Sequence, residues 1–203
     1  MNQKQPRRLK REDLPKSTPA LARYLIGKTL VHQLRRGLRL TGRIVETEAY
    51  VVGDAAAHTF RGETPRNRVL FMAPGRAYVY FIYGNHFMLN LSSGRAGIGE
   101  GILFRAAEPL EGLQEMRRRR GVEHIRDLAR GPGRLAEAFA IDRALDGMDC
   151  FDGKSPLWVG SALSPTSAIG ISVRIGITKE AHRELRFYER GSSFVSGLKS
   201  LNK

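Results

Sequence analysis

The stretch RAYVYFIYGNHFMLNLS, residues 76–92, decides the fold more than any other part of the chain. Aromatic and β-branched side chains fill its first half, a glycine and an asparagine follow, and a second strand-like run completes it. Two such runs joined by a short turn predict a β-hairpin. Because side chains alternate across a strand, Tyr78, Tyr80 and Ile82 would share one face of that hairpin.

The rest of the chain divides into short elements of both kinds. Two more strand-like runs, residues 28–33 and 38–48, are joined by a turn at 35–37. Turn and cap signals predict further strands and helices. The strands lie at 102–107, 157–159, 168–175 and 185–188, and the helices begin at Thr18, Thr64, Leu110 and Arg134. Because hairpins outnumber strand–helix–strand units, we expect one mixed α/β (α+β) domain with largely antiparallel strands.

The two ends of the chain differ from this body. Residues 1–17 are charged and lack hydrophobic periodicity, so we expect a basic, flexible N-terminal arm. That arm either only aids solubility or grips a nucleic acid. The single domain would span residues 18–197, and a short tail would cover 198–203.

The charge of the chain favours polyanionic partners. Its 203 residues carry 34 Lys+Arg against 20 Asp+Glu, a formal net charge of +14. A nucleic acid, an anionic membrane surface or an acidic protein could each bind to a chain with this positive charge. No apolar run approaches the ~20 residues of a membrane span, and the N-terminus lacks the apolar stretch of a signal peptide. Cys150 is the only cysteine, so we expect a cytoplasmic protein.

One predicted strand carries a candidate acid/base site. Glu46, Glu48 and Tyr50 lie two apart, so alternation places them on one face, with Val45, Thr47 and Ala49 on the other. His58 follows shortly after. These groups could form a general acid/base site, and a solvated polar face is the alternative. The histidines show no ligand spacing with one another or with the cysteine, so we expect no metal.

Three further features could contact a nucleic acid. The hairpin tyrosines either pack in a core or stack on bases; Tyr80 suits a pocket wall, and Tyr83, beside the turn, suits a wedge between bases. Free backbone N–H groups at the predicted helix start Gly131-Pro132-Gly133-Arg134 could hold a phosphate. The run Arg117–Arg120 is either a phosphate-contacting or a merely solvated surface.

Taken together, these motifs resemble the alkyladenine (3-methylpurine) DNA glycosylase family. The resemblance extends in order over roughly residues 20 to 196. It is carried by RIVETEAY (43–50), AH (57–58), TPRNR (64–68), YVYFIYG (78–84), Asn90, LFRA (103–106), EPLEG (108–112), GPGRL (131–135), RIGI (174–177), LRFY (185–188) and RGS (190–192).

The resemblance assigns roles to individual residues. It implies that Glu48 is the general base that deprotonates a water. It places an extruded purine in a pocket lined by Tyr50, His58, Tyr80 and Asn90, and makes Tyr83 the residue that intercalates in its place. Arg105 would hold the reacting nucleotide or its phosphate, and Gly133 and Arg134 would contact a phosphate. The same resemblance implies a curved sheet with surrounding helices and a protruding β-hairpin.

The function implied is excision of alkylated or deaminated purines, of the 3-methyladenine or hypoxanthine type, from double-stranded DNA. No lysine lies between Lys28 and Lys154, a span that holds every motif given a catalytic role. A Schiff base requires an amine, so we expect a monofunctional enzyme that uses water and leaves an abasic site. We expect it to act without a cofactor, as a monomer, in a bacterial-type, nucleoid-associated setting.

Two other functions explain part of the pattern. A non-enzymatic nucleic-acid-binding module would use the charge and the tyrosines but not the acidic cluster. A metal-dependent nuclease would use Glu46, Glu48 and His58.

Overall fold

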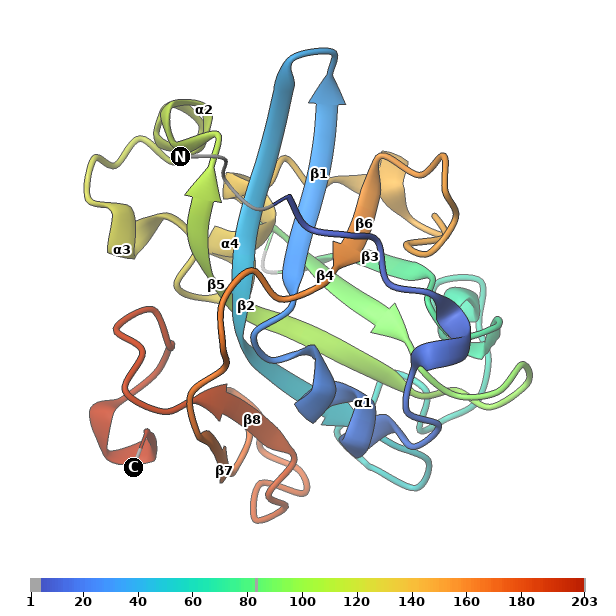
Figure 1. Ribbon diagram of the computed structural model, residues 1–203. Helices are drawn as coiled ribbons and strands as arrows, with labels where there is room; N and C mark the ends of the chain where they lie inside the picture. Colours follow the sequence, from blue (N-terminus) through green and yellow to red (C-terminus); the bar gives the residue numbers. More distant parts are fainter. Residues whose placement is uncertain (1–4, 83, 203) are drawn as a thin grey trace.

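A computed structural model describes residues 5–82 and 84–202, and its framework is an antiparallel sheet (Figure 1). The eight strands of the described residues are β1 (Thr29–Arg35), β2 (Leu38–Tyr50), β3 (Ala77–Ile82), β4 (His86–Ser92), β5 (Gly101–Glu111), β6 (Leu157–Gly160), β7 (Ile169–Ser172) and β8 (Arg186–Glu189). Six of them run in the order β3-β4-β5-β2-β1-β6, while β8 pairs with β2 and β7 pairs with β8. The predicted single α+β domain with a curled antiparallel sheet is confirmed.

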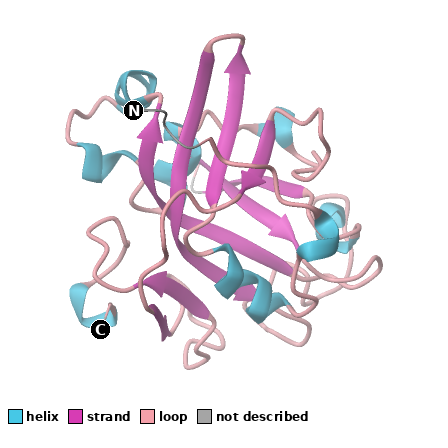
Figure 2. Cartoon of the chain, in the orientation of Figure 1, coloured by secondary structure: helices cyan, strands magenta, loops and turns pink. Residues whose placement is uncertain are grey.

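Short helices surround the sheet (Figure 2). They are α1 (Thr18–Leu25), α2 (Leu113–Arg120), α3 (Ile125–Leu128) and α4 (Pro132–Ala138), with single 3₁₀ turns at 11–13, 68–71, 143–145 and 199–201. Helix α1 begins at the predicted Thr18-Pro19 pair and buries Leu21 and Leu25. None of the helices in the described part of the chain is long and apolar enough to cross a membrane.

Strand β2 organises the sheet because it is paired along both edges. Its first half pairs with β1, from Thr29 opposite Arg43 onward, and its second half pairs with β8, from Glu46 opposite Tyr188 to Glu48 opposite Arg186. The other edge pairs with β5. The end of β2 therefore lies between two neighbouring strands, where its side chains are buried.

The register between β2 and β5 shifts on either side of Glu46. Ile44 faces Ala107 and Glu46 faces Ala106, so Val45 is an extra residue of β2; Thr47 then faces Phe104, so Arg105 is an extra residue of β5. Such bulges turn a strand and re-aim its side chains. The prediction that Val45 shares a face with Thr47 and Ala49 is wrong for this reason.

The sheet separates a hydrophobic core from a pocket. Ile44, Val79 and Phe104 point into the main core, which α1 and α4 cover, and Thr47 donates a hydrogen bond to the Ala22 carbonyl of α1. Val45 instead packs in a separate small cluster with Ala106, Tyr188 and Val195.

Several predicted helix bounds are corrected. The helix expected from Thr64 is only the 3₁₀ turn 68–71, because the Asn67 amide bonds to the His58 and Gly62 carbonyls and fastens a loop instead. The helix expected from Leu110 begins at Leu113, since β5 continues to Glu111.

Two other elements also differ from the prediction. Helix α4 begins at Pro132 rather than at Arg134, and the sequence did not predict α3.

The expected arm and tail both contact the domain. In the arm, Arg8 pairs with Gly160 of β6, and the Leu9 amide donates to the Val159 carbonyl at 3.0 Å. In the tail, Leu201 and Asn202 accept hydrogen bonds from Arg186 of β8. Both ends of the described chain are therefore held against strands of the sheet.

Candidate active site

A pocket of about 340 Å³ opens on the side of the sheet opposite the core. Its volume falls at the lower end of the range of roughly 300–1,000 Å³ that is usual for small-molecule sites. The wall combines the end of β2, strands β3, β4 and β5, the loop after β2 and the loop after β7. The residues that line it are Tyr50, Ala56, Ala57, His58, Thr59, Leu70, Tyr78, Tyr80, Ile82, Met88, Asn90, Gly101, Leu103, Arg105, Pro132, Ile175, Gly176 and Ile177.

Aromatic rings form one wall of the pocket. The rings of Tyr78 and Tyr80 stack with centroids 5.3 Å apart, and the His58 ring meets Tyr80 edge-on at 4.5 Å. The Tyr78 hydroxyl lies 3.1 Å from His58 Nδ1. Burial, together with the positive charge of Arg66, lowers the pKa of His58, so this imidazole is neutral near pH 7.

Glu48 has no exposed surface and lies against three residues of the pocket lining. Its Oε1 accepts from the Ile175 amide at 2.8 Å and pairs with Arg105 Nη1 at 3.2 Å, while its Oε2 accepts from the Tyr50 hydroxyl at 2.9 Å. These donors reach it from β5, from the loop after β7 and from its own strand. Glu48 and Tyr50 lie on one face of β2, as the alternation predicts.

Burial controls the ionisation of both groups. It raises the pKa of Glu48 above the usual value, and the Arg105 charge and the Ile175 and Tyr50 hydrogen bonds offset only part of that rise. Burial and the adjacent Glu48 carboxylate raise the pKa of Tyr50, which stays protonated and donates. The site therefore holds a carboxylate that is more basic than an exposed one.

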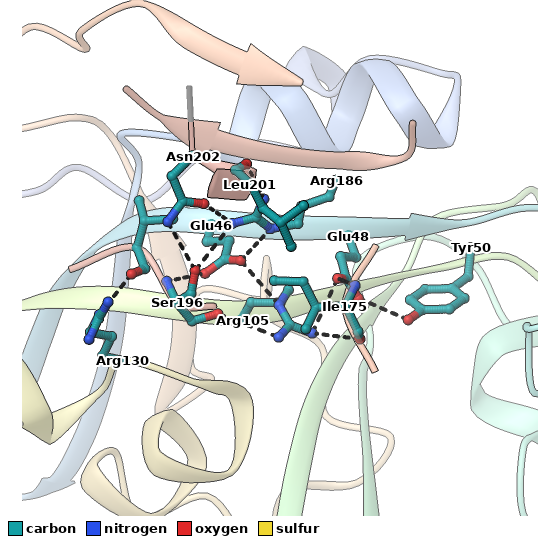
Figure 3. A network of polar contacts seen from close by, with 11 residues as sticks. Glu46, Glu48, Tyr50, Arg105, Arg130, Ile175, Arg186, Ser196, Leu201 and Asn202 are labelled. Atoms are coloured by element: carbon teal, nitrogen blue, oxygen red, sulfur yellow. Dashed lines mark hydrogen bonds and ion pairs between the residues drawn. The ribbon is translucent and has the colours of Figure 1, made fainter. Parts of the chain in front are cut away.

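Glu48 is the end of a chain of alternating charges (Figure 3). Arg105 Nε lies 3.2 Å from Glu46 Oε1, and Arg186 Nε donates to the same oxygen at 2.6 Å. The side chains of Arg186 and Glu46 are fully buried, and that of Arg105 is 8% exposed. We call Arg186, Glu46, Arg105 and Glu48 the charge chain; it is neutral overall. Burial alone would lower the pKa of Arg105, but the two carboxylates raise it.

A second buried pair supports Tyr50. Arg174 and Asp54 form a two-pronged ion pair with no exposed side-chain surface. The Arg174 guanidinium lies 4.6 Å over the Tyr50 ring and also donates to the Ala49 carbonyl. Since Ile175 follows directly, this pair anchors the backbone that donates to Glu48.

The structure brings most of the predicted site residues together. Tyr50, His58, Tyr80 and Asn90 all line the pocket, and Arg105 lines it while bridging the two carboxylates. Tyr83, the predicted wedge, lies outside the described residues.

The predicted phosphate site lies at the start of α4. The neighbouring Pro132 lines the pocket, Gly133 lies close against the His86 ring, and Arg134 is half-exposed 3.8 Å from Asp127.

Sequence reasoning missed the partners of Glu46. Arg186 and Ser196 lie 140 and 150 residues away in the chain. The one signal in the sequence is that Arg186 is a charged residue within the predicted strand 185–188. Alternation along that strand does not identify Glu46 as its partner.

The sequence carries no signal that links Asp54 with Arg174. Among the described residues, no group of three or more His, Cys, Asp or Glu side chains could hold a metal ion.

Comparison with known proteins covers nearly the whole chain. Residues 12–193 match the family model described as methylpurine-DNA glycosylase (MPG). A relative from Mesorhizobium japonicum is 62% identical over 193 residues, which cover 95% of this chain and 92% of the relative. A relative from Paraburkholderia phytofirmans is 50% identical over 95% of this chain and 90% of its own length. A relative from Methanoculleus marisnigri is 46% identical over 89% of this chain and 94% of its own length. All three carry the name "Putative 3-methyladenine DNA glycosylase".

The charge chain predicts unequal costs for removing two carboxylates. Glu46→Gln should lower the free energy of unfolding by about 3–5 kcal/mol, because it leaves Arg105 and Arg186 buried without the charge they share. Glu111→Gln removes an exposed partner of Arg39 and should cost only about 0–1 kcal/mol. Urea denaturation followed by circular dichroism measures both values, and equal losses would contradict the assignment.

Proposed function

The chain belongs to the methylpurine-DNA glycosylase family, whose members are hydrolases of N-glycosyl bonds, and on that premise we propose how its pocket performs the reaction. An alkylated or deaminated purine leaves the DNA stack and enters the pocket. Glu48 then activates a water that displaces the base from its sugar. The observation that carries the proposal is a buried, basic carboxylate directly behind an aromatic pocket.

The depth of Glu48 supports base flipping. Its carboxylate has no exposed surface and lies behind Tyr50 and Arg105, so a base inside a duplex could not approach it. Extruding one nucleotide costs a few kcal/mol, and least for a damaged or mispaired base. The pocket therefore favours lesions partly because they leave the stack more easily.

The hydrogen bonds of Glu48 leave acceptor capacity on its carboxylate for a water. A carboxylate accepts at roughly four positions. Among the described residues, the Ile175 amide and the Tyr50 hydroxyl occupy two of them, and Arg105 Nη1 lies 3.2 Å from Oε1 as an ion pair. The Ile175 carbonyl lies 3.4 Å from the same Arg105 nitrogen. A water at a free position would give its proton to Glu48 as its oxygen bonds to the sugar carbon, and the C–N bond breaks with its electron pair leaving on the base.

The charge of Glu48 also suits the transition state. Cleavage of a glycosidic bond develops positive charge on the sugar, and a nearby carboxylate offsets it. Arg105 orients the Glu48 carboxylate but does not fully neutralise its charge, because Arg105 also pairs with Glu46.

The pocket fits neutral as well as cationic purines. An aromatic face attracts a cationic base by roughly 0.5–2 kcal/mol. Arg174 already lies over Tyr50, and Arg66 lies 5.8 Å over Tyr80, so both rings already interact with a cation. Stacking and shape therefore contribute more to binding than charge does. This supports both 3-methyladenine-type and hypoxanthine-type substrates.

The unpaired arginine at the pocket rim fits the DNA backbone. Arg66 is exposed, donates to the Phe81 carbonyl at 3.3 Å and has no ion pair with the described residues. By contrast, each arginine of the 117–120 run meets a carboxylate of this chain. We assign backbone contact to Arg66 rather than to that run, and DNA as the partner of a monomeric, cofactor-free enzyme.

Glu48→Gln should reduce base release by roughly 10²–10⁴-fold while lesion-bearing DNA still binds, because the amide keeps the size of the side chain but cannot take a proton. Single-turnover release of free base from a duplex with one damaged purine measures the rate. Binding to the same duplex is the control. Full activity in the variant would refute the role of Glu48.

The rate should fall with acid at a higher pH than an ordinary carboxyl would give. Burial raises the pKa of Glu48, and only the ionised form accepts a proton, so the rate declines as pH drops through that pKa and levels off above it. A cationic purine leaves without further protonation, so its profile should show this limb alone. A neutral purine leaves more easily when protonated, so a second decline should appear at high pH. An acid limb that persists in the residual activity of Glu48→Gln would contradict the assignment.

Arg66→Gln should weaken binding to damaged and undamaged DNA alike and lower the salt slope of log Kd by about 0.9, the loss of one phosphate contact. Arg118→Gln is the matched control, because Arg118 is exposed but already paired with Glu115. Fluorescence anisotropy between roughly 50 and 200 mM salt measures both slopes. An equal change in the Arg118→Gln control would contradict a specific contact of Arg66, because it would show that only the net charge of the surface affects DNA binding.

A further inference from the structure

The C-terminal segment 195–202 closes the far end of the charge chain (Figure 3). Ser196 is 4% exposed, and it contacts three of the four residues of the charge chain. Its amide donates to Glu46 Oε2 at 2.7 Å, its hydroxyl accepts from Arg105 Nη2 at 3.4 Å, and its carbonyl accepts from Arg186 Nη2 at 3.3 Å. The amide and carbonyl contacts use the backbone, so only the contact with Arg105 depends on the serine hydroxyl.

The end of the segment satisfies Arg186. Arg186 Nη1 donates to the Leu201 carbonyl at 3.0 Å, and Nη2 donates to Asn202 Oδ1 at 2.6 Å. The Asn202 amide group also donates to the Ser196 carbonyl at 3.3 Å, which ties the segment to itself. Among the described residues, Glu46 is the only carboxylate that pairs with Arg186. The remaining acceptors of this buried guanidinium come from the segment.

Another contact holds the segment in place. Arg130 Nε, which precedes α4, donates to the Val195 carbonyl at 2.8 Å. Lys199, in the same segment, is exposed. The segment therefore has an inner side that meets the charge chain and an outer side that faces solvent.

We propose that the segment 195–202, through Ser196 and Asn202, is a positioning element that holds Arg186 and Glu46 so that Arg105 stays on Glu48. It rests on the proposed role of Glu48 as the base. Glu46 Oε1 is shared between Arg186 and Arg105. If Arg186 is released, Glu46 draws Arg105 toward itself and away from Glu48.

The consequence for Glu48 has a definite sign. The groups that face Glu48 are Arg105 from β5, Tyr50 and Glu46 from β2, and the Ile175 amide. Of these, only Arg105 brings a positive charge, and that charge lowers the pKa of the Glu48 carboxyl. Loosening Arg105 would therefore move the acid limb of the reaction to higher pH. It would also remove the ion pair that orients the carboxylate, and this loss of orientation would slow the reaction above the limb.

The test compares three single variants of the full chain. Asn202→Ala removes the side-chain acceptor of Arg186, Asn202→Asp keeps an acceptor oxygen there, and Lys199→Ala changes an exposed neighbour. Single-turnover base release is measured across pH with saturating enzyme. Binding to duplex DNA with an abasic site and a urea midpoint are measured in parallel.

The proposal predicts that Asn202→Ala slows release roughly tenfold and moves the acid midpoint to higher pH, with DNA binding unchanged. Asn202→Asp should restore both values in large part, and Lys199→Ala should match the wild type. A slower Asn202→Ala with an unmoved midpoint would overturn the proposal, because lost folding alone reduces only the active fraction. A wild-type rate in Asn202→Ala would overturn it too.

These outcomes are distinct from failure of the proposed function. If Glu48 is not the base, the wild type itself lacks the acid limb or Glu48→Gln stays active. If only the positioning role fails, the wild-type limb is present and depends on Glu48, but Asn202→Ala leaves it where it is.

Discussion

Burying Glu48 is possible only because positive charge is buried with it. A carboxylate taken out of water loses several kcal/mol of hydration, and pairing with good geometry offsets that loss. Arg105 provides the pairing, but Arg105 is itself buried and needs a second carboxylate, which in turn needs Arg186. The charges end where Arg186 meets neutral carbonyl and amide oxygens of the C-terminal segment. Burying the single carboxylate of Glu48 therefore requires charged and polar partners from β2, β5, β8 and the C-terminal segment 195–202.

The backbone makes this arrangement possible through two bulges. Regular pairing of β2 with β5 would give Val45 and Arg105 partners directly opposite. Each is an extra residue in its strand, and the strand bends there. The bend turns Arg105 between the two carboxylates while Phe104 stays in the core. The same feature places the start of the site where β8 replaces β1 beside β2.

The local parts of this site can be predicted from sequence, and the long-range parts cannot. Alternation places Glu48 with Tyr50, and the hairpin pattern places Tyr78 with Tyr80, because each relation spans two residues of one strand. The partners of Glu46 are 59, 140 and 150 residues away, so only the sheet order brings them together. The arginine run 117–120 was conspicuous in sequence, yet its carboxylate partners, among them Glu115 and Glu137, decide its charge in the fold.

The charged residues behind the net charge of +14 divide into a buried, paired set and an exposed set. Arg105, Arg174 and Arg186 are buried against Glu46, Glu48 and Asp54, so these six charges cancel within the fold. The surplus must lie on the outside, where it can neutralise phosphates and respond to salt. In the mechanism proposed for Glu48, a neutral charge chain would let the developing charge of the sugar interact with the one carboxylate nearest to it. Under the proposed mechanism, affinity for DNA and stabilisation of the transition state would therefore depend on separate sets of charges.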